Sequence, residues 1–288
     1  MIMKPRTEPL ELKAKKLLNV RMNAIHNEWN VANIQKGYEG EKQFDALFEN
    51  SPDHWLILND LLLDNNNSKF QIDTLVIATN NIYLFDVKNF KGDFCIEGDK
   101  WKSTYGKEIT NPVFQLQRCE SSFRQLLQNN RIGSEFSVAA YLVFVNPEFT
   151  LYNALRDLPI VLPTQINRFL EKLRKYSPNQ PLSSSQMMLA KQLVAMNIDQ
   201  SPYARLPQYD FENLIKGIIC EHCQVFMINS MKRSQLICPK CGKSEAVESC
   251  VLRSAEEFKL LFPEKKITTN NIYEWCKIIT CKKRINRI

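Results

Sequence analysis

Two acidic residues and a lysine interrupt a pair of apolar segments, Gln71–Ala78 and Ile82–Lys88. Asp73 lies in the first segment, and Asp86 and Lys88 lie in the second. Both segments are rich in β-branched and aromatic residues, and an Asn-Asn pair separates them, so the pattern predicts an antiparallel hairpin. Charged groups in apolar strands lower stability unless they are paired, so their presence there indicates a functional role. These three residues are therefore candidates for chemistry.

The turn decides which of these side chains meet. If the loop consists of the two asparagines, Asp73 faces Lys88 and lies diagonal to Asp86, with all three side chains on one face. Diagonal neighbours on a sheet lie roughly 7–8 Å apart, so two carboxylates can share one metal ion. The hairpin therefore predicts an acidic metal site with a lysine beside it.

Further motifs precede and follow the hairpin in a definite order. They are Gly37-Tyr38-Glu39-Gly40-Glu41, Gln71-Ile72-Asp73, Asp86-Val87-Lys88-Asn89-Phe90-Lys91-Gly92 and Asn111-Pro112-Val113-Phe114-Gln115. Together they resemble the nuclease-related domain family, NERD, of the PD-(D/E)xK nucleases with the restriction-endonuclease-like fold. The resemblance covers about residues 37–150. One departure is Asp86, where the family more often has Glu; the shorter side chain keeps the ligand chemistry.

The resemblance implies a nuclease that uses Mg²⁺ or Mn²⁺ to hydrolyse phosphodiester bonds, with DNA as the favoured substrate. Asp73, Asp86 and the Val87 carbonyl are then the expected metal ligands. Lys88 is expected to position or help deprotonate the attacking water and to stabilise negative charge on the phosphoryl group. Gln115 is expected to orient the water or a phosphate.

Glu41 is the remaining candidate for this site. It shares one face of an expected helix with Phe44 and Phe48. One interpretation is a partly exposed residue at the edge of that face. The resemblance favours another, because the family places an acidic residue of this helix at the metal site, directly or through water.

A second metal site is expected near the carboxyl end. Cys220-x-x-Cys223 and Cys238-x-x-Cys241 are two close pairs whose spacing is typical of a tetrahedral Zn²⁺ site. Gly242 follows the second pair, where a knuckle needs an unhindered backbone. This predicts a zinc ribbon with one structural Zn²⁺, in which His222 is a bystander.

Composition is compatible with these expectations. The 288 residues carry a net charge of +7, with 44% hydrophobic and 24% charged residues. The charge favours a polyanionic partner, although a mildly basic protein without one is the alternative. No apolar run approaches the roughly 20 residues of a membrane span, and the first residues lack a signal-peptide hydrophobic region. The expected compartment is therefore the cytoplasm.

The order of expected elements is helix, strands, helix, strand, which predicts an α/β fold with a mixed sheet flanked by helices. Strands are expected near 55–63, 70–79, 82–89, 93–97, 100–104, 136–145 and 159–163, and helices near 38–49, 112–129 and 164–176. The expected domains are an N-terminal helical arm (1–36), the nuclease-like domain (37–176), a linker with a helix (177–210), the zinc ribbon (211–249) and a C-terminal helical module (250–288).

The C-terminal module offers two interpretations. Ser254 is expected to cap one helix and Thr268 a second, followed by a basic end at Lys282, Lys283, Arg284 and Arg287. The pattern resembles a small helix-turn-helix unit, and the alternative is a docking helix pair with a solvated tail. Ribbon residues Lys232, Arg233, Lys240 and Lys243 either contact phosphates or are solvated.

Two functions compete with nuclease activity. The chain is alternatively a non-catalytic nucleic-acid-binding protein of a defence, repair or plasmid-associated system. A third interpretation is a regulatory protein whose basic tail contacts a partner protein. The presence of Glu41, Asp73, Asp86 and Lys88 favours an active enzyme.

Overall fold

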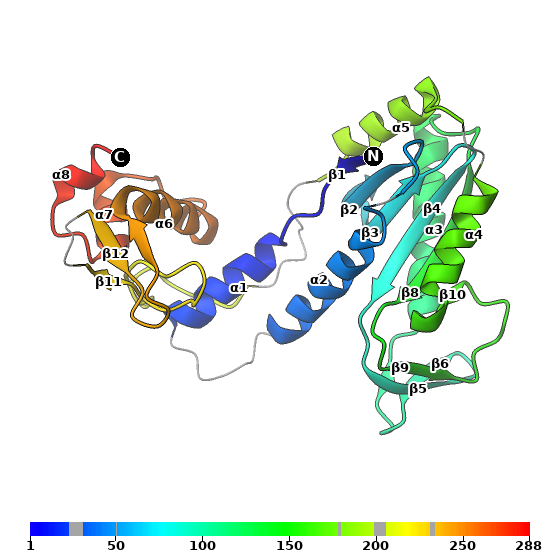
Figure 1. The fold of residues 1–288 in the computed structure, drawn as a ribbon, viewed down its shortest axis with the longest axis horizontal. Coiled ribbons are helices and arrows are strands. Elements are labelled where there is room, and N and C mark those ends of the chain that lie inside the picture. Colours follow the sequence, from blue (N-terminus) through cyan, green and yellow to red (C-terminus); the bar gives the residue numbers. More distant parts are fainter. Residues whose placement is uncertain (23–30, 50, 178–179, 199–205, 231–233) are drawn as a thin grey trace. The chain divides into compact units, whose positions relative to one another are not determined.

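The structure is a computed structural model that describes residues 1–22, 31–49, 51–177, 180–198, 206–230 and 234–288. The chain divides into two compact units. The first unit comprises residues 1–7 and 33–202, and the second comprises residues 8–32 and 203–288 (Figure 1). Among the residues described, none of the helices combines the length and the apolar character needed to cross a membrane.

A six-stranded mixed sheet forms the centre of the first unit (Figure 1). Its strands, in spatial order, are β1 (Ile2–Lys4), β2 (Leu56–Asn65), β3 (Ser68–Ile77), β4 (Asn81–Lys88), β8 (Ser137–Phe144) and β10 (Ile160–Val161). The β2–β3–β4 pairs are antiparallel, whereas β1, β8 and β10 pair in parallel with their neighbours. The mixed α/β sheet predicted from the sequence is confirmed.

Helices cover both faces of this sheet. Helices α3 (Pro112–Asn130) and α5 (Ser184–Ala195) pack on one face, with Phe123 and Leu193 completely buried. Helices α2 (Val31–Ala46) and α4 (Ile166–Tyr176) pack on the other face, and the short η1 helix (Pro163–Gln165) precedes α4. The sheet therefore has a separate apolar core on each side, as expected for strands buried on both faces.

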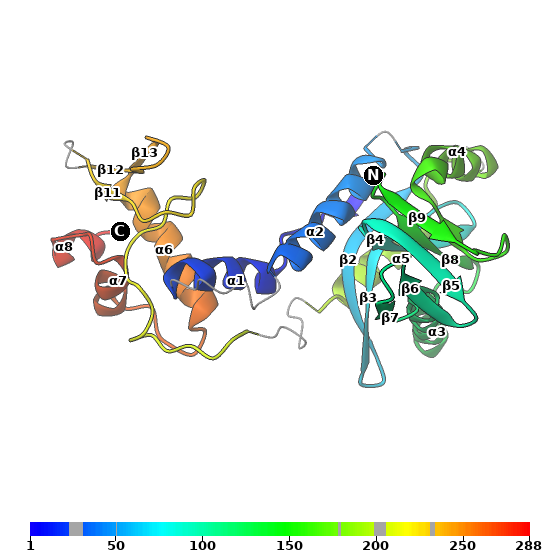
Figure 2. The ribbon, with the colours of Figure 1, turned by 90° about the horizontal axis from the view of Figure 1, so that it is seen from below.

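A smaller sheet extends the core on the α3 side (Figure 2). Its strands, in spatial order, are β7 (Glu108–Ile109), β6 (Lys100–Ser103), β5 (Gly92–Glu97) and β9 (Phe149–Tyr152). Phe149 stacks on Phe144 of β8 with ring centroids 3.9 Å apart, and Trp101 stacks on the same ring. These aromatic contacts attach the smaller sheet to the end of β8.

Local sequence explains where α3 begins and ends. The side chain of Asn111 accepts a hydrogen bond from the Val113 amide at 2.9 Å, and Pro112 occupies the first turn. Both features are favourable at a helix start, as the sequence predicted. The helix ends at Asn130, and the next residue, Arg131, adopts a left-handed conformation.

The β3–β4 hairpin has a different register from the one expected. Ile77 pairs with Ile82, and Thr74 pairs with Phe85. The turn does consist of two residues, but these are Thr79 and Asn80 rather than the two asparagines, because the Ala78 amide donates to the Asn81 carbonyl at 2.8 Å. The register is shifted by two residues, so the prediction that Asp73 faces Lys88 is wrong.

The second unit consists of a helix from early in the chain, a small sheet and three later helices. These are α1 (Leu10–Arg21), the antiparallel strands β11 (Ile228–Asn229), β12 (Gln235–Ile237) and β13 (Ser244–Ala246), and then α6 (Val247–Leu261), α7 (Thr269–Cys276) and α8 (Lys282–Ile285). Leu18 of α1, Phe258 of α6 and Trp275 of α7 are completely buried in one core.

Arg21 is the polar centre of that core. Its side chain is 0% exposed, and its guanidinium donates to Glu257 at 2.7 Å and to the carbonyls of Ile215 and Gly217. It also lies over the Trp275 ring at 3.8 Å. Burial of this charge is tolerated because the guanidinium has acceptors at its edge and an aromatic ring on its face.

Three expected elements differ from the structure. Residues 1–36 do not form one helical arm, because β1 joins the first sheet and α1 packs in the second unit. Helix α5 packs on the core of the first unit, although it was expected within a linker. Ser254 is buried within α6, which begins earlier, at Val247, directly after β13. Thr268 does cap α7.

Candidate metal-binding and phosphodiester site

The candidate site lies where β3 and β4 separate. Their ladder ends at the Thr74–Phe85 pair. Beyond this pair, the side chain of Asp73 connects β3 to β4 in place of a backbone hydrogen bond. Its Oδ2 accepts a hydrogen bond from the Val87 amide at 2.8 Å. The separation opens the sheet between two strands, and it brings the Asp73 side chain next to the Asp86 segment.

A cavity of about 570 Å³ lies over this opening, on the side of the sheet that carries α3. Asp73, Asp86 and Lys88 line it from the strands, and Gln115 lines it from α3. The Lys88 ammonium is 2.6 Å from Oδ1 of Asp86. Four of the residues selected from the sequence therefore surround one cavity.

Burial and like charge dominate the electrostatics of the cavity. Desolvation by burial, followed by the nearby Asp86 charge, raises the pKa of Asp73 to about 6. Burial by itself lowers the pKa of Lys88, but Asp86 and Asp73 outweigh it, so that pKa is raised and the ammonium stays protonated. Cys119 also lines the cavity, and burial raises the pKa of its thiol to about 12, which leaves it un-ionised.

Glu41 lies outside the lining of this cavity and approaches from α2. Its carboxylate is 2.6 Å from the guanidinium of Arg6. Burial and then Asp73 raise the pKa of Glu41, and Arg6 opposes that effect. Arg6 also pairs with Asp45, one turn later in α2, at 2.7 Å. Glu41 is therefore electrostatically coupled to Asp73 although it is held by another partner.

Gly40 explains how α2 reaches the strands. A Cβ at this position would lie 2.6 Å from the Cβ of Asn89, which directly follows β4. Asn89 in turn donates to the Lys36 carbonyl of α2 at 2.7 Å and accepts from Asn146 at 3.0 Å. The missing side chain allows the close approach that places Glu41 beside the end of β4.

The residues that the sequence did not indicate are Arg6 and Asp45. Each carries an ordinary charge in a segment whose composition is typical of a polar helix surface or a terminal arm. Arg6 contacts positions 35 and 39 residues away, so no local periodicity links them. Val87, selected for its carbonyl, contributes its amide to Asp73, and its side chain is buried in the α2–α4 core.

The donors at this site fit a hard divalent cation. Asp73 and Asp86 supply carboxylate oxygens beside an open cavity, and Mg²⁺ is commonly bound by one or two carboxylates together with water. The carboxylates repel each other, as the raised pKa of Asp73 indicates, and a cation would relieve that repulsion. In the described part of the chain these acids do not form a compact cage with all ligand atoms within 4.8 Å.

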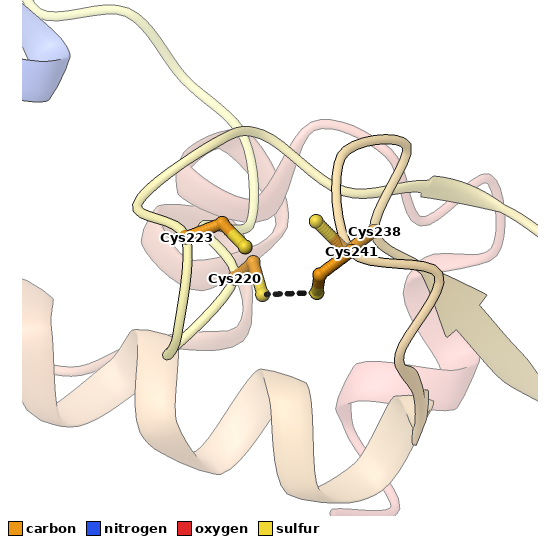
Figure 3. A group of neighbouring side chains, drawn as sticks. All are labelled: Cys220, Cys223, Cys238 and Cys241. Carbon is orange, nitrogen blue, oxygen red and sulfur yellow. Dashed lines mark hydrogen bonds between the residues drawn. The ribbon is translucent and has the colours of Figure 1, made fainter.

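Four cysteines form such a compact group in the second unit (Figure 3). The Sγ atoms of Cys220, Cys223, Cys238 and Cys241 all lie within 4.8 Å of one another. The Sγ atoms of Cys220 and Cys241 are 3.9 Å apart. Zn–S bonds of about 2.3 Å in a tetrahedron imply an S–S separation near roughly 3.8 Å. The cluster can hold a structural zinc, as the sequence predicted.

The two cysteine pairs have matching backbone geometry. The Gln224 amide donates to the Cys220 carbonyl, and the Gly242 amide donates to the Cys238 carbonyl, at 3.0 and 2.9 Å. Both Gln224 and Gly242 have positive φ angles, 54° and 71°. This repeated turn aims both thiols of each pair at one point. Lys243 contacts His222, which is not part of the cysteine group.

Comparison with known proteins identifies the segment that carries the first site. Residues 36–145 match the family model described as the nuclease-related domain, NERD. This range contains Glu41, Asp73, Asp86, Lys88 and Gln115. No curated protein and no solved structure matches the chain. Residues 36–145 are therefore a nuclease-related domain, in a chain whose second unit contains a four-cysteine cluster consistent with a zinc-binding module.

Proposed function

We propose that the protein is a divalent-metal-dependent nuclease that hydrolyses phosphodiester bonds, with DNA as the favoured substrate. The supporting observation is the cavity lined by Asp73, Asp86 and Lys88 within a nuclease-related domain. Two carboxylates with a protonated amine beside them suit the binding of a cation and of a phosphate together.

Asp73 and Asp86 would hold Mg²⁺ or Mn²⁺, with the Val87 carbonyl as a further ligand and Glu41 acting directly or through water. When bound, the cation would lower the pKa of a water ligand and neutralise charge on the phosphate. The Val87 amide keeps the Asp73 carboxylate oriented, because it donates to Oδ2.

Lys88 would act as a fixed positive charge. Its raised pKa keeps the ammonium protonated at neutral pH, so it is better suited to orient the attacking water and stabilise the phosphoryl oxygens than to accept a proton. Gln115, across the cavity on α3, would orient the water or a phosphate through its amide.

The second unit would supply nucleic-acid affinity. Residues 8–32 and 203–288 contain 19 basic and 12 acidic residues, whereas the first unit contains 19 of each. The net charge of +7 therefore lies entirely in the second unit. A groove there is lined by Lys216, Lys277 and Lys282 with Tyr273, and also by Glu212 and Glu274. A zinc ion at the four cysteines would stabilise this unit and would have no part in the chemistry.

The test is incubation of the purified protein with labelled single- and double-stranded DNA and RNA and with supercoiled plasmid, in Mg²⁺, Mn²⁺ or EDTA. We expect metal-dependent cleavage, and a reduction of at least about a hundredfold in Asp73→Asn and Lys88→Ala. Asp73→Asn is nearly isosteric and retains an oxygen that can accept from Val87. Asp99→Asn and Lys107→Ala, at exposed positions of the same unit, are the matched controls.

Each outcome has a definite meaning. Cleavage that persists in both site variants contradicts the assignment of the site. Binding of nucleic acid without cleavage in any metal supports the non-catalytic alternative. Absence of both binding and cleavage removes the nuclease proposal altogether.

A further inference from the structure

Arg6 makes an extensive set of polar contacts near the acid site. Its side chain is 3% exposed. Its Nε and Nη2 donate to the two carboxylate oxygens of Asp45 at 2.7 and 3.1 Å, and its Nη1 donates to Glu41 at 2.6 Å. Nη2 also donates to the Asp73 carbonyl at 2.7 Å and to Oγ1 of Thr74 at 3.2 Å. A guanidinium presents its N–H donors in a fixed plane, so acceptors on all three nitrogens hold it in one orientation.

These contacts join three elements at the place where the candidate metal ligands emerge. Glu41 and Asp45 lie four residues apart on one face of α2, and like charges at that spacing repel. Arg6 pairs with both carboxylates and offsets this repulsion. The same guanidinium holds the backbone of β3 at Asp73 and the side chain of Thr74. One side chain therefore links α2 to β3 at this point.

The position of Arg6 is in turn fixed by β1. Ile2 pairs with Ile57 of β2, and the Ile57 amide donates to the Met1 carbonyl at 3.0 Å. The Lys4 ammonium donates to the carbonyls of Asn59 and Asp60 at 2.8 and 2.6 Å. Arg6 follows shortly after this strand, outside the segment 36–145 that matches the nuclease-related domain.

We propose that Arg6 is a positioning residue of the metal site, which holds Glu41 at the carboxylate cluster. This inference rests on the proposed function, since it concerns the same site. Without Arg6, Glu41 and Asp45 repel each other and Asp73. The Glu41 carboxylate then turns away from the strands, and the cation loses that donor.

The experiment measures Mn²⁺ affinity in the full-length, zinc-loaded protein by electron paramagnetic resonance titration. Arg6→Gln should weaken Mn²⁺ binding by about 10- to 100-fold, the usual effect of removing a partner that orients a ligand. Arg6→Lys, which keeps one charge but cannot bridge two carboxylates, should give an intermediate affinity. Lys4→Gln is the matched control, because it removes contacts of the same segment to the Asn59 and Asp60 carbonyls rather than to Glu41 or Asp45, and it should change the affinity less than about threefold.

A double-mutant cycle separates positioning from general loosening of the fold. Glu41→Gln should weaken Mn²⁺ binding, and adding Arg6→Gln to it should have no further effect, because residues that act through one contact are not additive. If Arg6→Gln weakens binding equally in both backgrounds, or if Lys4→Gln has the same effect as Arg6→Gln, the inference is wrong.

The controls also distinguish this inference from the proposed function. If the wild-type protein binds no Mn²⁺, or if Asp73→Asn does not weaken the Mn²⁺ binding, the proposed metal site itself is wrong. Wild-type binding that Asp73→Asn removes and Arg6→Gln leaves unchanged contradicts only the role of Arg6. Should Arg6→Gln fail to fold, Arg6→Lys carries the comparison with Lys4→Gln.

Discussion

Asp73 combines partial burial with a carboxylate neighbour, and this combination has a consequence for stability. The pKa of Asp73 in the folded protein is raised from an ordinary 3.8 to about 6. The folded state then binds the proton more tightly than the unfolded state does. Ionisation of Asp73 therefore lowers the free energy of unfolding. This penalty is absent at low pH, grows as pH rises from about 4 to about 6, and is complete above that range.

We expect the first unit to lose stability across this pH range by up to about 3 kcal/mol in buffer without Mg²⁺ or Mn²⁺, since each pKa unit corresponds to about 1.4 kcal/mol. Asp73→Asn should reduce this dependence and leave the part that comes from the raised pKa of Glu41, whereas Asp99→Asn should leave the dependence unchanged. Amide hydrogen exchange of β3 and β4 measures the stability of this unit separately. Equal pH dependence in wild type and Asp73→Asn would contradict the prediction.

The sequence indicated Asp73, Asp86 and Lys88 although the expected register was wrong. The actual register differs by two residues, and side chains along a strand alternate with a period of two. The shift therefore kept all three side chains on one face. A shift of one residue would have separated them. Arg6 and Asp45 were missed because an ion pair between distant segments leaves no periodic pattern.

At the scale of elements, α2 contains two glycines that differ in their surroundings. A Cβ at Gly37 would have no heavy atom within 4 Å, whereas a Cβ at Gly40 would meet Asn89 at 2.6 Å. Glycine within a helix costs about 0.5–1 kcal/mol relative to alanine. The helix therefore carries this cost twice, and only at Gly40 does a close approach of another segment explain it.

Gly37→Ala should raise the free energy of unfolding of the first unit by about 0.5–1 kcal/mol. Gly40→Ala should lower it by roughly 1–3 kcal/mol, because Asn89 follows β4 directly and its Cβ cannot move without the backbone. Gly40→Ala should also weaken Mn²⁺ binding through displacement of Glu41. Chemical denaturation of both variants tests the sign, and stabilisation by Gly40→Ala would contradict the packing of α2 on β4.

The four-cysteine module depends on few backbone contacts, since its strands contain only two or three residues each. Elemental analysis should find about one Zn²⁺ per chain, and Cys238→Ser should abolish it and disorder β11–β13, because structural zinc supplies folding energy. Cys281→Ser, at an exposed cysteine outside the cluster, is the control. The first unit should keep its fold in both variants. A zinc-free protein with an ordered ribbon would refute the assignment.

Spacing alone predicted this module, because metal coordination fixes the separation of ligands in sequence. The start of α6 was not predictable in the same way. Ser254 has the pattern of a cap followed by acids, yet it is buried inside the helix. Burial against the core of the second unit outweighed the local capping preference, a common outcome when tertiary packing competes with local propensity.

At the scale of the whole molecule, the net charge of +7 lies in the second unit. Deleting residues 211–288 is an unsuitable test of this feature, because α1 belongs to the second unit and would lose the core that covers Leu18. The sequence indicated a helical segment where α1 lies, but nothing in that segment identified packing partners so far along the chain. Charge changes within the full chain avoid the problem.

We expect Lys277→Gln, Lys282→Gln and Lys283→Gln together to weaken binding to duplex DNA. The plot of log affinity against log salt should also become flatter, by about 0.9 for each phosphate that the variant no longer neutralises. The matched control changes exposed Lys107, Lys172 and Lys191 of the first unit to Gln. Affinity measured across a salt series distinguishes the two sets. Equal effects, or none, would contradict a role for the second unit in binding.

The placement of α1 also has a consequence for biosynthesis. Arg21 leaves the ribosome early, whereas its partner Glu257 lies 236 residues later. At about 5–20 residues per second, the nascent chain carries α1 for roughly 10–50 s before that partner is made. During this interval the apolar face of α1, with Leu12 and Leu18, has no native cover. Exposed apolar surface of this kind favours aggregation, so we expect α1 to need cover by a chaperone during this interval.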